Sequence, residues 1–137
     1  MSNLISFIVK IKNNCIDTEF KYLFTSLSRS FILEKNDEEI FDVFRNNSFK
    51  ETDLYRDCLE IARELDYSSI SSVLEIIVDK FKIYDNYIKI GNIHSGIVKL
   101  SKLREMALNL EELGYDVERF SNYLKELLEV GIKIEYT

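Results

Sequence analysis

The sequence predicts an all-α protein, a single-domain bundle of about six to seven amphipathic helices. The 137 residues include no proline and only four glycines, so few residues interrupt a helix. Apolar side chains recur every three or four residues along most of the chain, as they do on one face of a helix. Because 46% of the residues are hydrophobic, we expect one core and a single helical domain over residues 1–137.

The first element is expected at residues 4–12, and the second is a helix with an apolar face that runs from Phe20 to Phe31. Periodicity alone allows the first to be a helix or a strand, and only its context favours a helix. Asp17 or Thr18 can cap the second, whose phenylalanine-rich face is expected to belong to the core.

Two capping boxes are predicted next. Asn36 with Glu39 would open a short helix, and Ser48 with Glu51 a longer helix over about residues 48–65. In both pairs a short polar side chain is followed three residues later by a glutamate, which can satisfy the first free amides of a helix.

A very hydrophobic helix is predicted after the serines of residues 68–72, and its apolar face extends to Phe81 and Tyr84. Glycines and small polar residues then gather at residues 91–96, which we interpret as a connection between helices. Ser95 can cap the helix that follows.

The stretch from Leu100 to Gly131 is predicted to form two amphipathic helices that bury their apolar faces against each other. Gly114 fits a left-handed helix exit, and Asp116 fits the cap of the second helix. The first apolar face comprises Ile97, Leu100, Leu103, Ala107, Leu110 and Leu113, and the second comprises Val117, Phe120, Leu124, Leu127 and Leu128.

The last six residues, IKIEYT, alternate apolar and polar side chains and are expected to form the start of a short strand or an extended exit. A strand without a partner leaves its hydrogen-bonding groups unpaired, so we expect the chain to be a piece of a larger polypeptide.

The chain carries a net charge of −6, which argues against a protein that coats nucleic acids generally. No apolar run reaches the roughly 18 residues of a membrane span, and the N-terminus lacks the features of a signal peptide. With only two cysteines, we expect a cytoplasmic protein with reduced thiols and no membrane partner.

Catalytic motifs are missing from the sequence. It contains no phosphate-binding GxxxxGK[ST] loop, GxGxxG, HExxH, CxxC or GxSxG. Cys58 is expected to be a buried thiol, and His94 an ordinary loop residue without a metal. Acidic pairs at residues 38–39 and 111–112 are expected on solvated helix faces, so no catalytic residue and no metal ligand are predicted.

One segment has the opposite charge balance. Residues 80–104 contain six basic residues and one acidic residue, so this segment is +5 while the remainder is −11. Basic side chains beside a glycine-containing loop can contact DNA phosphates, although a solvated surface that balances acidic neighbours is the alternative. The candidate DNA-binding residues are Lys80, Lys82, Lys89, Gly91, Asn92, His94, Gly96, Lys99, Lys102 and Arg104.

The stretch KLREMALNLEELGYDVERFSNYLKELLEVG resembles a segment of the UvrD-like superfamily 1 DNA helicases, which include the PcrA, RecB and AddA relatives. In that family a comparable segment closes the 2B accessory subdomain. Upstream, SLSRSFILEKNDEEIFDVF and YIKIG are similar to the same helicases, so the resemblance extends over nearly the whole chain. The matching residues are Leu103, Ala107, Leu110, Glu111, Gly114, Phe120, Tyr123, Leu124 and Leu127.

The resemblance implies an accessory subdomain that engages duplex or forked DNA beside the motor domains of an ATP-dependent 3′ to 5′ helicase of repair or recombination. ATP and Mg²⁺ would serve that parent protein. This chain lacks three motifs of such helicases, namely the ATP-binding loop, the acidic Mg²⁺ motif and the motif that resembles TIHKSKGLE. No ATPase activity and no cofactor are therefore expected here. The family contacts duplex DNA through a GIG motif, which is not clearly present in this sequence. Its nearest counterpart is the loop with Gly91, Asn92 and Gly96. The alternative function is that of a free-standing helical interaction or regulatory protein.

Overall fold

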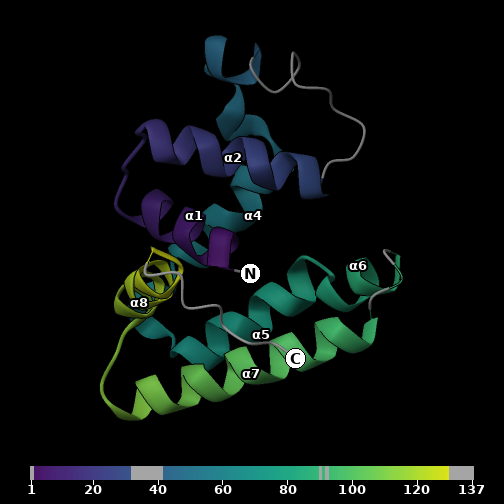
Figure 1. The fold of residues 1–137 in the computed structure, drawn as a ribbon. Coiled ribbons are helices and arrows are strands. Elements are labelled where there is room, and N and C mark those ends of the chain that lie inside the picture. The colour runs from purple at the N-terminus through teal and green to yellow at the C-terminus, as the bar shows by residue number, and fades with distance from the viewer. Residues whose placement is uncertain (1, 32–41, 90, 92, 130–137) are drawn as a thin grey trace. The chain divides into compact units, whose positions relative to one another are not determined.

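A computed structural model describes residues 2–31, 42–89, 91 and 93–129 (Figure 1). Those residues form α-helices and short 3-10 helices without any strand, which confirms the predicted all-α bundle for this part of the chain. Because the strand predicted for IKIEYT and the capping box at Asn36 lie outside the described residues, both stay predictions.

Contacts within the chain group it into two compact units, Met1–Asp66 and Tyr67–Thr137, which we describe separately. The prediction of one domain over residues 1–137 stays a prediction.

The first unit is built around helix α1 (Ser2–Lys12), which packs against α2 (Thr18–Phe31) and α4 (Asp53–Ala62). Six consecutive residues of α1, Leu4–Val9, are buried, so it is covered on most of its circumference. The segment is therefore a helix. Its sequence left the choice between helix and strand open because a segment that is buried on nearly all sides shows no clear hydrophobic periodicity.

Aromatic rings fill the core of this unit. The rings of Phe7 and Phe20 stack with their centroids 4.8 Å apart, and the ring of Phe24 meets that of Phe44 edge-on, also at 4.8 Å. Phe49 joins them from the 3-10 helix η1 (Phe49–Glu51), with its centroid 5.3 Å from that of Phe44. Phe20 and Phe24 of α2 are therefore core residues, as predicted, and edge-on pairs add to the stabilisation from burial.

The predicted cap Asp17 is confirmed, since its Oδ1 accepts a hydrogen bond from the Phe20 amide at 2.8 Å. The predicted cap Ser48 is wrong. It precedes η1 and makes no capping hydrogen bond, whereas Thr52 caps α4 by accepting a hydrogen bond from the Tyr55 amide at 3.3 Å. The first turn thus closes as a 3-10 helix, and the α-helix begins four residues later than the capping box suggested.

In the second unit, helix α5 (Ile70–Lys80) packs against α6 (Ile83–Lys89), α7 (Ile93–Glu112) and α8 (Val117–Glu129). Ser69 caps α5 by accepting a hydrogen bond from the Ser72 amide at 3.2 Å.

The predicted continuation of α5 to Tyr84 is wrong. Phe81 ends α5, and Lys82 adopts a left-handed conformation with φ of +50°, so α6 starts as a separate helix. No glycine or asparagine marks this break in the sequence.

Helix α7 begins at Ile93, so the predicted connection is shorter than residues 91–96. Gly91, with φ of +68°, ends α6 and allows α7 to start two residues later. His94 and Gly96 therefore lie inside α7 and not in a loop, and Ser95 cannot be its cap.

The predicted turn after α7 is confirmed. Gly114 has φ of +86°, and the Asp116 carboxylate accepts a hydrogen bond from the Arg119 amide at 2.8 Å. Helix α5 packs against both α7 and α8, so these two helices do not simply bury their apolar faces against each other. The prediction that Ile97 and Leu113 belong to the buried face is wrong, since Ile97 is 47% exposed and Leu113 is 72% exposed.

Replacing Thr52 with alanine should lower the free energy of unfolding by about 1 kcal/mol, because the α4 cap is lost. Ser48→Ala is the matched control and should cost less, since Ser48 makes no capping hydrogen bond and its hydroxyl only donates to the Val43 carbonyl at 3.3 Å. Urea unfolding of both variants measures the difference. An equal or larger loss for Ser48→Ala would contradict the observed cap.

Candidate functional site

The candidate DNA-binding residues fall on consecutive elements of the second unit. Lys80 ends α5, Lys82 lies in the turn after it, and Lys89 belongs to α6. His94, Lys99, Lys102 and Arg104 lie on α7. The structure thus places the predicted basic residues at the end of α5, in the turn after it, on α6 and on α7 between Ile93 and Arg104.

Arg104 is held by the protein itself. Its Nε and Nη2 donate to the two carboxylate oxygens of Glu75 at 2.6 and 3.0 Å, and its Nη1 donates to the Tyr84 hydroxyl at 2.8 Å. The hydrogen bond to Glu75 raises the pKa of Arg104, although burial opposes this shift. Because this guanidinium donates hydrogen bonds to residues of both α5 and α6, it links α7 to these helices. The main role of Arg104 is therefore structural.

Other candidates differ in how well they can meet a phosphate. Lys82 and Lys99 are exposed, and Lys80 and Lys102 are half-buried. Gly96 is buried within α7, so its backbone cannot form the loop contact that the sequence suggested. Gly91 is exposed, and Asn92 lies outside the described residues.

Helix α7 has an unusual order of charges. Its N-terminal part, Ile93–Arg104, contains three basic residues and no acidic one, whereas the rest of the helix contains Glu105, Glu111 and Glu112 and no basic residue. Helix dipoles favour the opposite order, with acidic side chains at the N-terminus and basic ones at the C-terminus. Glu111 and Glu112 in the last turn are thus unfavourably placed for the dipole, whereas Lys99, Lys102 and Arg104 lie in the middle turns, where its effect has fallen off.

Glu111, considered above as an acid or base, has a structural contact instead. Its Oε1 accepts hydrogen bonds from the amide and the hydroxyl of Ser71, each at 3.1 Å. These bonds, that of the amide foremost, lower the pKa of Glu111. The carboxylate thus ties the C-terminal end of α7 to the first turn of α5, where the free amides of a helix favour a negative charge.

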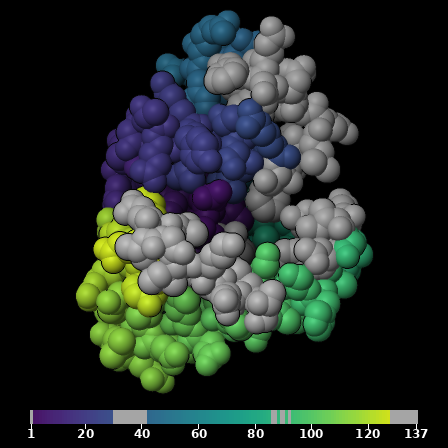
Figure 2. All heavy atoms as spheres, in the orientation of Figure 1, coloured from purple at the N-terminus to yellow at the C-terminus, as the bar shows by residue number. Residues whose placement is uncertain are grey.

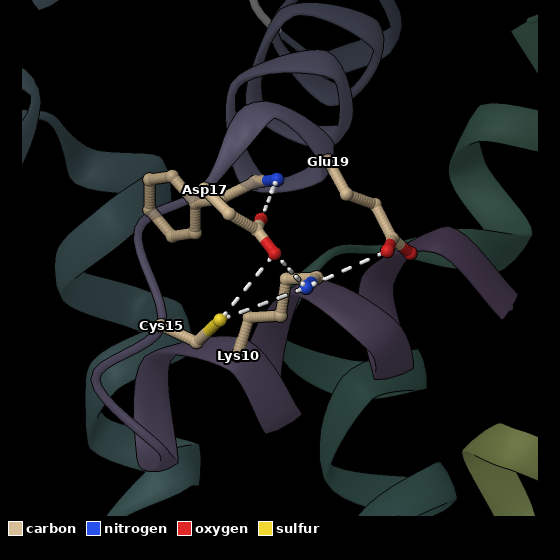
Figure 3. A network of polar contacts seen from close by, with 5 residues as sticks. Lys10, Cys15, Asp17 and Glu19 are labelled. Atoms are coloured by element: carbon tan, nitrogen blue, oxygen red, sulfur yellow. Dashed lines mark hydrogen bonds and ion pairs between the residues drawn. The ribbon is translucent and has the colours of Figure 1, made fainter.

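A second polar cluster, which the sequence did not suggest, joins α1 to the start of α2 (Figure 3). The Lys10 Nζ contacts Asp17 Oδ2 at 2.8 Å, Glu19 Oε2 at 3.5 Å and Cys15 Sγ at 3.9 Å. The Cys15 thiol donates to Asp17 Oδ2 at 3.4 Å. The chain reversal at Asn14, with φ of +51°, brings these residues together, and no spacing rule for a helix or a strand could have found them.

The hydrogen bonds from Lys10 and from the Phe20 amide hold the pKa of Asp17 well below its ordinary value. Hydrogen bonding to Asp17 also raises the pKa of Lys10, against the effect of its partial burial. Both groups are therefore charged at neutral pH, and neither is suited to proton transfer there.

The described residues show no catalytic constellation. Cys58 is fully buried, as predicted, and His94 is exposed on α7. No group of three or more His, Cys, Asp or Glu side chains is placed to hold a metal ion within the described part of the chain. In the same residues, no helix has both the length and the apolar character needed to cross a membrane.

Comparisons of the chain with protein-family models, with curated proteins and with solved structures find no match.

Replacing Asp17 with asparagine should make the stability of the protein less dependent on pH in acid. Because the pKa of Asp17 is lowered by folding, the carboxylate stabilises the fold above its ordinary pKa of about 4. That contribution is lost progressively as the pH falls from about 4 through the lowered pKa of the folded state, so wild type and variant should approach each other as the solution becomes more acidic. Urea unfolding of both proteins across this range measures the difference.

Lys10→Gln is the companion variant, since it removes the same hydrogen bond from the other side. It should reproduce the pH-dependent loss, and it should add little in the Asp17→Asn background. A difference between wild type and Asp17→Asn that stays constant with pH would contradict this role of the ion pair.

Proposed function

We propose that this chain is an accessory, 2B-like subdomain of a UvrD-like, ATP-dependent 3′ to 5′ DNA helicase of repair or recombination. Its role would be to engage duplex or forked DNA beside the motor domains, with ATP and Mg²⁺ bound by the parent protein and no catalytic activity in this stretch. A cytoplasmic location goes with this proposal.

The α7–α8 hairpin carries the proposal. The apolar residues that match the helicase segment are mostly core residues here, since Leu103, Ala107 and Phe120 are each at most 2% exposed. The matching glycine, Gly114, occupies the left-handed turn between the helices. The residues behind the resemblance are thus the ones that shape this pair of helices, which supports a common local fold.

The basic residues of α6 and α7 supply the proposed contact with DNA. Lys82 and Lys99 are exposed, and Lys89 is carried by the neighbouring α6, whereas Arg104 is bound to Glu75. Few basic side chains are therefore placed to contact DNA phosphates, and the net charge of the chain is −6. DNA binding by this chain alone should thus be weak.

A free-standing helical interaction protein is the second candidate function. The observation in its favour is the exposure of large apolar side chains on α7, with Ile97 47% and Leu108 52% exposed. Phosphate recognition does not require such side chains, whereas protein interfaces do.

Replacing Lys82, Lys89 and Lys99 together with glutamate should abolish the weak binding of a labelled DNA duplex. Wild-type binding should weaken steeply with salt, because each contacted phosphate releases counterions, and the logarithmic slope is about −0.9 for each such contact. Fluorescence anisotropy at several salt concentrations measures both effects.

Lys21→Glu is the charge-matched control, because Lys21 is exposed on α2 in the other unit. Lys21→Glu should leave the affinity for duplex DNA and the salt slope nearly unchanged. Lys99→Glu changes the charge by the same amount but should weaken binding. Duplex binding that survives the triple substitution, or no binding by the wild type at low salt, would count against the DNA role.

A further inference from the structure

We draw no further inference here: the strongest candidate, the apolar patch of Ile97 and Leu108 on helix α7, which Figure 2 shows in green at the molecular surface, carries nothing because nothing in the structure shows what covers it.

Discussion

The fold depends on how helices end in a chain without proline. Among the described residues, those with positive φ each lie just after a helix and reverse or redirect the chain there, and they are Asn14, Asn47, Lys82, Gly91 and Gly114. A left-handed residue stops the helical hydrogen-bond ladder and lets the last carbonyl groups find partners. Side chains such as those of Asp17, Thr52 and Asp116 then satisfy the first amides of the next helix.

Local signals of this kind explain which elements could be predicted. Gly114 with Asp116 is a strong pair, since glycine adopts positive φ without penalty and aspartate is a favoured cap. Lys82 carries no such signal, because an ordinary side chain disfavours this conformation and only the packing of α5, α6 and α7 holds it there. The break between α5 and α6 was therefore invisible in the sequence.

The pairing of side chains was harder to predict than the helices. Arg104 counted as one of several cations in a basic segment, and its two hydrogen bonds to Glu75 appear only when α5 lies beside α7. Lys10 and Asp17 likewise meet because the chain turns at Asn14. A count of charges along the sequence therefore overstates the cations available to a nucleic acid, since it cannot subtract those already bound within the protein.

Helix α7 concentrates the remaining unexplained features of the molecule. Its buried stripe, with Leu100, Leu103 and Ala107, is explained by packing against α5 and α6. The exposure of Ile97 and Leu108 on another face is not explained in this way, because both lose stabilisation by staying in water. Contact with DNA phosphates would use the lysines of this helix and leave that apolar pair exposed, whereas a protein partner could cover the apolar pair. The apolar pair therefore separates a protein-interaction role from a DNA-binding role, since phosphate contacts do not require it.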